Sequence, residues 1–290
     1  MRLYFLMLIK RICSIIAPKW YIRRRFISNH HYTPNFKEPK RHSEKIAARK
    51  FNYTKEMSVL SDKIAVRDYV REKVGEEYLI PSYAVLDKLT EKAFEELPES
   101  FVIKANHGSR FNLIVRDKSQ FTFEEVKKLT DRWLRNKYYL IGMELHYRHI
   151  KPKLIVEKLL LDSEGKVPKD YKLHHFKNNG DPKLFIGVHT DRFENYEYNC
   201  YDEDWNVQQN PWVGEKDIYE NSVIKQRPKE LDLLKELCGK LASRFKYVRV
   251  DFYIVDDRIY FGEMTFTPNG GAMKLKREEV DRCLGGLWGD

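Results

Sequence analysis

Apolar and polar residues alternate along residues 247–268, a pattern typical of two strands that each bury one face. The first arm has an apolar side, made by Val248, Val250, Phe252 and Ile254. Its other side carries Arg249 and Asp251. The pattern therefore predicts a β-hairpin with charged groups opposite an apolar face.

The length of the turn decides which residues of the second arm face these charges. A three-residue turn at Asp256, Asp257 and Arg258 pairs Val255 with Ile259, Asp251 with Glu263, and Arg249 with Thr265. A two-residue turn at 256–257 shifts the register by one residue and sends the two carboxylates to opposite faces. We favour the three-residue turn because it continues the apolar side through Tyr260, Gly262, Met264 and Phe266.

The rest of the chain mixes helical and strand patterns and contains no internal repeats. The predicted helices are 61–74, begun by Ser61 or Asp62, then 91–97, 123–137 and 229–245. The predicted strands are 78–86, broken at Pro81, then 101–117 with a loop in the middle, 153–160, 171–177, 183–189 and 200–206. Three glycines near the C-terminus, Gly285, Gly286 and Gly289, suggest a frayed end.

The excess positive charge lies in the N-terminal segment. Of the net charge of +10, residues 1–50 contribute +11, from 13 Lys and Arg against two Glu, so the remaining 240 residues are nearly neutral at −1. Residues 1–26 contain two apolar runs, split by Lys10 and Arg11 and followed by Trp20, Tyr21 and three arginines. Residues 28–56 are polar and weakly patterned, which indicates a linker with one short helix.

Neither apolar run reaches the roughly 20 residues that span a bilayer, and no small-residue cleavage site marks a secretory signal. A helix that lies on an anionic membrane surface fits residues 1–26. A helix packed on the body of the protein is the alternative. We expect no nucleic-acid partner, because no nucleic-acid motif accompanies the charge.

Four cysteines, Cys13, Cys200, Cys238 and Cys283, are far apart and form no C-x-x-C pair. This spacing favours a reducing compartment over a disulfide scaffold or a zinc module. Together with the basic segment, it predicts a cytoplasmic protein at the inner face of the cell membrane. With 290 residues, 42% of them hydrophobic, the chain can form one large domain or two intimate ones.

Two segments carry candidate chemistry. Asp251 and Glu263 repel each other across the hairpin unless a cation lies between them, and such a pair suits Mg²⁺ bound with a polyphosphate. In 101–117, Lys104 ends a strand beside the turn Asn106-His107-Gly108-Ser109, so backbone N–H groups and a lysine meet as phosphates require. The alternative for the 247–268 hairpin is a solvated strand face without a metal. The alternative for 101–117 is an ordinary hairpin without a ligand.

In this order, the lysine loop, the strand 153–160 and the two-carboxylate hairpin resemble the ATP-grasp superfamily. The likeness is greatest to the branch named for teichuronopeptide biosynthesis, the TupA-like ATP-grasp proteins, and it extends from about Ser61 to Ala272. The matching segments are SDKIAVRDYV, FVIKANHGS, KPKLIVEKLL, DYKLHHF, HTDRF, FKYVRVDFY and IYFGEMTFTP. One departure is that Arg110 and Phe111 follow NHGS, where further glycines are expected.

The resemblance implies an α+β fold in which two lobes with antiparallel sheets hold ATP between them. The charge pattern predicts a basic amphipathic arm and linker at 1–56, and the resemblance implies an ATP-grasp domain at 57–290, with lobes at about 100–160 and about 161–275. The implied cofactors are ATP and Mg²⁺.

The resemblance also implies roles for single residues. The implied nucleotide-binding residues are Lys63, Lys104, His107, Gly108 and Ser109 at the phosphates, and Glu157, Lys158 and Leu160 at adenine and ribose. The implied metal ligands are Asp251, Glu263 and Thr265, the last standing where many relatives have Asn. Arg249 would stabilise developing charge, and Lys172, Asp191 and Arg192 would lie on the phosphate and acceptor side.

The implied activity is an ATP-dependent carboxylate–amine ligase that forms an amide through an acyl-phosphate. Its acceptor would be a uronic-acid-containing cell-surface polysaccharide or precursor, joined to an amino acid or amine. The alternatives are an ATP-grasp glycan kinase, a glycosyltransferase that uses Asp202, Glu203 and Asp204, and a membrane-held scaffold.

Overall fold

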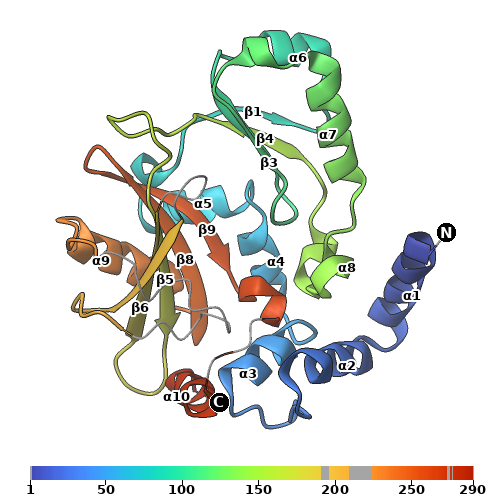
Figure 1. Ribbon diagram of the computed structural model, residues 1–290, viewed down its shortest axis with the longest axis vertical. Coiled ribbons are helices and arrows are strands. Elements are labelled where there is room, and N and C mark those ends of the chain that lie inside the picture. The colour runs from blue at the N-terminus through green and yellow to red at the C-terminus, as the bar shows by residue number, and fades with distance from the viewer. Residues whose placement is uncertain (1, 191–195, 209–223, 273–274, 276, 290) are drawn as a thin grey trace.

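Two antiparallel sheets, each covered by helices on its outer side, make up the body of the protein in the computed structural model (Figure 1). The structure describes residues 2–190, 196–208, 224–272, 275 and 277–289. The α+β class expected from the sequence is thereby confirmed.

The helices and strands have the following bounds. The helices are α1 (Arg2–Ile16), α2 (Pro18–His30), α3 (His42–Arg49), α4 (Lys55–Ser61), α5 (Val66–Lys73), α6 (Glu91–Glu95), α7 (Phe123–Arg135), α8 (Tyr139–Gly142), α9 (Leu231–Ala242) and α10 (Glu278–Leu287). The strands are β1 (Ser82–Leu86), β2 (Phe101–Ala105), β3 (Asn112–Val115), β4 (Leu154–Glu157), β5 (Asp170–Phe176), β6 (Lys183–Thr190), β7 (Glu197–Asp202), β8 (Tyr247–Val255) and β9 (Arg258–Thr265). Short 3₁₀ helices occur at Glu76–Tyr78, Lys118–Gln120, Leu145–His149 and Pro268–Gly271.

The first sheet has the strand order β1-β4-β2-β3. Side chains alternate across it, so that Phe101, Ile103 and Ala105 of β2 pack with α6 and α7 in one apolar cluster. Val102 and Lys104 point to the opposite face. That face therefore carries a charge toward the second sheet.

The second sheet has the order β7-β6-β5-β8-β9. Its outer face packs against α5 and α9, with Val248, Val250 and Phe252 fully buried in the largest apolar cluster. Arg249 and Asp251 alternate with these residues and face inward. The two sheets thus turn their charged faces toward the space between them.

The β8–β9 hairpin has the predicted pairing of its charges but not the predicted turn. Val255 pairs with Arg258, so the turn contains only Asp256 and Asp257, both with positive φ. A bulge at Gly262 then absorbs one residue of β9 and brings Glu263 opposite Asp251 and Thr265 opposite Arg249. We expected the two-residue turn to separate the carboxylates, which was wrong because the bulge restores the register.

The bulge also changes the faces of β9. Ile259 and Phe261 lie in the large core beside Phe252, whereas Tyr260 packs in a separate cluster with Ile80 and Leu160. The prediction that Tyr260 and Gly262 continue the apolar side of β8 was therefore wrong. The same prediction for Met264 and Phe266, which follow the bulge, is confirmed, because both are buried in the core.

Helix α5 begins later than the predicted helix 61–74. The Asp62 carboxylate accepts the N–H groups of Ile64 (2.9 Å) and Ala65 (3.4 Å), and this turn delays the helix to Val66. Lys63 consequently lies in the turn between α4 and α5, next to the loop after β2.

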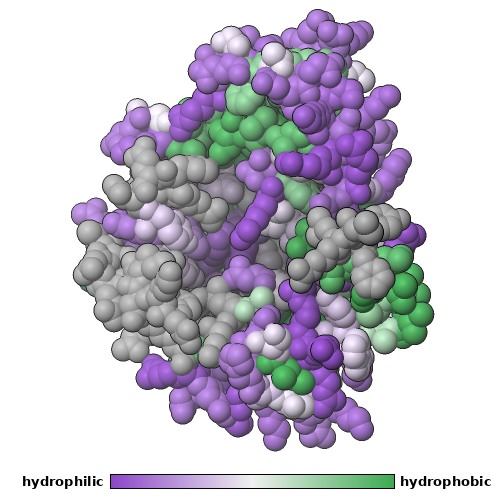
Figure 2. Space-filling view, turned by 45° about the vertical axis from the view of Figure 1, so that its right-hand side comes forward, coloured by the Kyte–Doolittle hydropathy of each residue, from purple (hydrophilic) through white to green (hydrophobic). Residues whose placement is uncertain are grey.

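The N-terminal segment forms α1 and α2, and α2 buries Ile22 and Phe26 against the body. Helix α1 leaves Leu6, Leu8, Ile12, Ile15 and Ile16 exposed. Figure 2 shows the resulting hydrophobic surface over α1 on the right-hand side of the molecule. Within the described residues, no helix is long and apolar enough to cross a membrane.

The short helix expected in the linker 28–56 is α3, which buries Ile46, Ala47 and Ala48. The C-terminal glycines are not a frayed end, because Gly285 and Gly286 lie in α10, which packs on α3.

Candidate functional site

Arg249 and Asp251 form the centre of the charged face of the second sheet. The Arg249 guanidinium donates to both carboxylate oxygens of Asp251, at 2.6 and 2.8 Å. It also donates to Glu263 Oε1 at 2.9 Å and to Thr265 Oγ1 at 3.0 Å. One cation thus bridges the two opposed carboxylates, as their repulsion requires.

Lys172 of β5 completes this cluster from the neighbouring strand. It pairs with Asp251 Oδ2 and, at 2.9 Å, with Asp170. Burial by itself lowers the pKa of Arg249, but the charges of Asp251 and Glu263 outweigh burial and raise it. For Glu263, burial and Asp251 raise the pKa, whereas Lys63, Arg249 and Lys172 outweigh both and hold it below its ordinary value.

The oxygen donors on this hairpin suit Mg²⁺. Asp251, Glu263 and Thr265 offer two carboxylates and a hydroxyl on one face, the hard oxygen ligands that magnesium prefers. Among the residues that the structure describes, no group of three or more His, Cys, Asp and Glu is placed to hold a metal. A magnesium ion here would therefore complete its coordination with phosphate oxygens or water, as Mg²⁺ bound with a nucleotide does.

A second charged cluster lies on the facing sheet. Lys104 of β2 donates to Glu157 Oε2 at 2.6 Å, and Arg67 of α5 donates to Glu157 Oε1 at 3.2 Å and to the Ile80 carbonyl at 2.9 Å. Sequence reasoning missed Arg67. Its place four residues after Lys63, at the start of a helix, is the signal that could have found it.

The loop after β2 is held firmly. Lys63 Nζ donates to the Gly108 carbonyl at 2.6 Å, and burial lowers the pKa of Lys63. A Cβ at Gly108 would lie 2.6 Å from the Tyr138 ring, so only glycine fits there. Phe111 packs against His107, Trp133 and Tyr138, which makes the loop stiff where glycines were expected.

The expected phosphate-binding residues of the 106–109 loop differ in their exposure. His107 is buried, its Nε2 lies 3.1 Å from the Asn136 carbonyl, and burial lowers its pKa. Ser109 is exposed. Arg192 and Asp191 lie outside the described residues.

A cavity of about 130 Å³ lies between the two sheets. Its lining includes Lys104, Lys158 and Leu160 from the expected nucleotide-binding set, with Asp170 and Tyr253 from the second sheet. The apolar lining residues are Ile80, Val102, Ile114, Leu159, Leu160 and Val167. The Lys158 N–H already donates to the Pro81 carbonyl at 2.8 Å.

A buried carboxylate that the sequence did not single out lies near Glu263. Glu144 accepts hydrogen bonds from Thr267 Oγ1 (2.5 Å) and from the Tyr138 hydroxyl (3.2 Å). Burial raises its pKa, and Glu263 adds to the shift, while Thr267, Lys50 and Tyr138 oppose it. Because Tyr138 also packs on Gly108, Glu144 connects the loop after β2 to the segment after β9.

The acidic triplet Asp202, Glu203 and Asp204 builds a turn. Asp202 accepts the N–H groups of Asp204 and Asn206, and Glu203 binds Lys183. These contacts explain the triplet without a metal or a nucleotide-sugar.

A sequence model described as TupA-like ATPgrasp matches residues 44–288. The chain belongs to the TupA-like ATP-grasp family. The family named from the hairpin and loop residues is thereby confirmed. No curated protein matches this TupA-like chain significantly.

Several solved structures of ligases and synthetases are similar to this TupA-like protein. An ADP complex of N5-carboxyaminoimidazole ribonucleotide synthetase is 12% identical with a TM-score of 0.45, and the match covers 73% of this chain and 46% of that one. The D-alanine-D-alanine ligase from Helicobacter pylori is 14% identical with a TM-score of 0.46, over 85% of this chain and 68% of that one. The L-amino acid ligase from Bacillus licheniformis is 13% identical with a TM-score of 0.46, over 79% and 49%. This chain thus spans less than half the length of the first of these proteins.

Proposed function

We propose that this protein is an ATP-dependent carboxylate–amine ligase that forms an amide through an acyl-phosphate. The observation that carries the proposal is the bridged set of Arg249, Asp251 and Glu263, which faces Lys104 and Glu157 across the space between the sheets. Membership of the TupA-like ATP-grasp family supports it.

In this proposal the adenine ring occupies the cavity between the sheets, against the apolar side chains of Ile80 and Leu160. The Lys158 N–H already donates to Pro81, so in this proposal the base is bound by the Lys158 carbonyl and by the backbone groups of Leu159 and Leu160. Lys63 and Lys104 bind the phosphates together with the 106–109 loop. Both lysines are already held by the chain, at Gly108 and Glu157, so little side-chain freedom is lost on binding.

Asp251, Glu263 and Thr265 would hold Mg²⁺, whose chemistry is to offset the charge of the polyphosphate. Arg249 keeps the two carboxylates together and presents its guanidinium to the transferred phosphoryl group. Lys172 neutralises Asp251 and Asp170 from the adjacent strand.

The reaction needs no nucleophilic side chain. A substrate carboxylate oxygen attacks the γ-phosphorus of ATP, which releases ADP and forms the acyl-phosphate. An amine nitrogen then attacks the acyl carbon, phosphate leaves, and the amine loses a proton. The residues of this site act by binding, orienting and neutralising charge.

We assign the acceptor to a uronic-acid-containing cell-surface polysaccharide or its precursor, joined to an amino acid or amine. This assignment rests on the branch of the family that the chain resembles. Residues 1–26 would hold the enzyme on the anionic inner face of the membrane, because α1 exposes Ile12, Ile15 and Ile16. Two hydrogen bonds connect residues 1–26 to the body of the protein. Arg148 donates to the Ser14 carbonyl at 2.6 Å, and Arg25 donates to the Ile141 carbonyl at 2.7 Å.

The test is release of ADP in the presence of Mg²⁺, a uronate acceptor and a panel of amino acids, with the product analysed by mass. An amide product that requires all components supports the proposal. A phosphate ester formed without an amine would make the protein a glycan kinase instead. Activity that persists when both Asp251 and Glu263 are substituted would rule out the ligase assignment and the kinase assignment together.

A further inference from the structure

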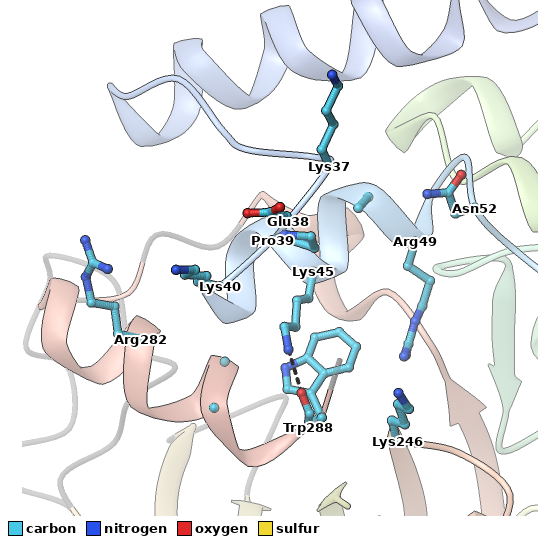
Figure 3. Close-up of a pocket in the computed structure, with 14 residues that line it drawn as sticks. Lys37, Glu38, Pro39, Lys40, Lys45, Arg49, Asn52, Lys246, Arg282 and Trp288 are labelled. Carbon is cyan, nitrogen blue, oxygen red and sulfur yellow. Dashed lines mark hydrogen bonds between the residues drawn. The ribbon is translucent and has the colours of Figure 1, made fainter. Parts of the chain in front are cut away.

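A second cavity, of about 920 Å³, lies where α3, α10 and the start of β8 meet (Figure 3). Its lining residues are Lys37, Glu38, Pro39, Lys40, Lys45, Ala48, Arg49, Asn52, Lys246, Arg282, Gly285, Gly286, Trp288 and Gly289. None of them belongs to the proposed nucleotide or metal set. The proposed function therefore leaves this cavity without a role.

The walls of this cavity are fixed by buried polar contacts. Glu44 accepts the backbone N–H groups of Asn35 at 3.0 Å and of Lys40 and Arg41 at 3.1 Å, which folds the loop before α3. Asp281 of α10 accepts both the N–H of Ser43 (2.8 Å) and its hydroxyl (2.5 Å). The cavity is thus built before any ligand arrives, which lowers the cost of binding.

The lining has a strong excess of positive charge, with six Lys and Arg against Glu38. Arg282 shares its charge with Glu278, at 2.7 Å. In the part of the chain that the structure describes, Lys37, Lys40 and Lys246 make no ion pair. Cations gathered in a hollow with few acids to neutralise them attract anions.

Arg49 and Trp288 form the inner end of the cavity. Arg49 stacks over the Trp288 ring at 4.5 Å and donates to the carbonyls of Tyr247 (2.8 Å) and Phe266 (3.3 Å). Lys45 Nζ donates to the Trp288 carbonyl at 2.6 Å (Figure 3). The indole Nε1 of Trp288, a residue only 3% exposed, has no hydrogen-bond partner in the described structure. A buried donor without a partner therefore lies in a residue that lines the cationic cavity.

The size of the cavity and the type of its cations define the ligand. A single phosphate fills only a small part of about 920 Å³, and the lysines come from separate segments, the 35–41 loop, α3 and the start of β8. Lysines act as point charges and not as the planar forks that bind one phosphate group bidentately. The matching ligand carries several negative charges that are spaced along it.

We propose that this cavity binds an acidic oligosaccharide segment through the carboxylates of successive sugars. The proposal rests on the proposed function, since that function supplies a carboxylate-bearing glycan. Arg49 contacts the ends of β8 and β9, and Arg249 lies two residues beyond Tyr247, roughly 7 Å along the strand. A chain held in the cavity therefore lies near the end of the hairpin that carries the catalytic charges.

The experiment is calorimetric titration of the full-length protein with tetragalacturonate, without ATP, at low and high salt. The matched ligand control is maltotetraose, a neutral sugar of the same length. The test variant is Lys40→Ala with Lys246→Ala, and the matched protein control is Lys88→Ala with Lys92→Ala, which removes two exposed lysines far along the chain from the cavity. Binding of MgATP to each variant is measured separately.

We expect tetragalacturonate to bind, maltotetraose not to bind, and added salt to weaken binding. The cavity variant should lose about tenfold in affinity or more, and the control variant less than twofold, while MgATP binding stays unchanged in both. Equal binding of the neutral sugar, no loss in the cavity variant, or tighter binding of tripolyphosphate or single-stranded DNA than of the uronate would overturn the proposal. Failure of the ligase assay with intact uronate binding would count against the proposed function only.

Discussion

Asp251 lies directly opposite Glu263 on the β8–β9 hairpin because Gly262 forms a bulge between the turn and the pair. The two-residue turn at Asp256 and Asp257 would otherwise place the carboxylates on opposite faces of the sheet. The bulge is therefore the local feature that creates the candidate metal site.

Adding a side chain at the bulge tests this relationship. A Cβ at Gly262 would lie 3.0 Å from the Asp251 carbonyl oxygen, a backbone atom that cannot move without shifting the pair. We expect Gly262→Ala to lower the free energy of unfolding by about 1–2 kcal/mol and to weaken MgATP binding. Urea unfolding and calorimetry measure the two effects. The control, Gly239→Ala in α9, meets no atom within 4 Å and should raise stability by about 0.5–1 kcal/mol. A loss of the same size in both variants would contradict this account.

Lys104 provides a test of the phosphate end of the site. Its ammonium group is held by Glu157 at 2.6 Å, so Lys104→Met removes a positioned charge. We expect ATP affinity to fall roughly tenfold or more, because a charge-assisted hydrogen bond is worth about 1.5–3 kcal/mol. Lys153→Met, just before β4, removes a lysine that pairs only loosely with Asp87 at 3.5 Å and should leave affinity nearly unchanged. Equal affinities in the two variants would remove Lys104 from the site.

Glu144 should make stability depend on pH. Burial raises its pKa above the ordinary value of 4.5, so between 4.5 and the raised value the folded state binds more protons than the unfolded state. The Glu144 contribution to stability is therefore present below about pH 4.5 and falls as the pH rises through the raised pKa. Glu144→Gln keeps groups that can bond Thr267 and Tyr138 but removes this titration.

Unfolding in urea at a series of pH values from 4.5 to 8 checks this prediction. The free energy of unfolding of Glu144→Gln, relative to that of the wild type, should rise with pH across this range. A difference that stays constant, or falls, would show that the carboxyl does not titrate as its burial indicates.

Two neighbouring glycines of the C-terminal helix α10 test how this helix packs. A Cβ at Gly285 would lie 2.0 Å from the Lys40 carbonyl oxygen, whereas at Gly286 it meets no atom within 4 Å. We expect Gly285→Ala to cost about 1–3 kcal/mol of stability and Gly286→Ala to add about 0.5–1 kcal/mol. Thermal unfolding of both proteins should move in opposite directions, and a shift of the same sign would mean that α10 does not pack on the 40–41 backbone.

The sequence predicted the parts of the fold that depend on local alternation. The apolar face of β8, the helix that became α7 and the strand at 101–105 follow directly from the spacing of their apolar residues. The hairpin turn could not be predicted, because a bulge at Gly262 and a third turn residue explain the same pairing of Asp251 and Glu263. Alternation alone cannot distinguish these two cases.

Long-range packing explains the other differences. Gly285 looked like a flexible end because its close neighbour, the Lys40 carbonyl, lies more than 200 residues earlier in the chain. Arg67 was missed because its partner, Glu157, lies in strand β4, 90 residues later in the chain. The roles assigned to all of the site residues, and the lobe boundaries, stay predictions.

The most direct test of the account is calorimetric binding of ATP with and without Mg²⁺, to the wild type and to Asp251→Asn with Glu263→Gln. The matched control is Asp256→Asn with Asp257→Asn, which makes the same change of charge at the turn of the same hairpin and suits its positive φ angles. We predict micromolar, Mg²⁺-dependent binding to the wild type and the turn variant, and none to the Asp251 and Glu263 variant. Equal binding by all three proteins, or no binding by the wild type, would contradict the assignment of this hairpin as the nucleotide and metal site.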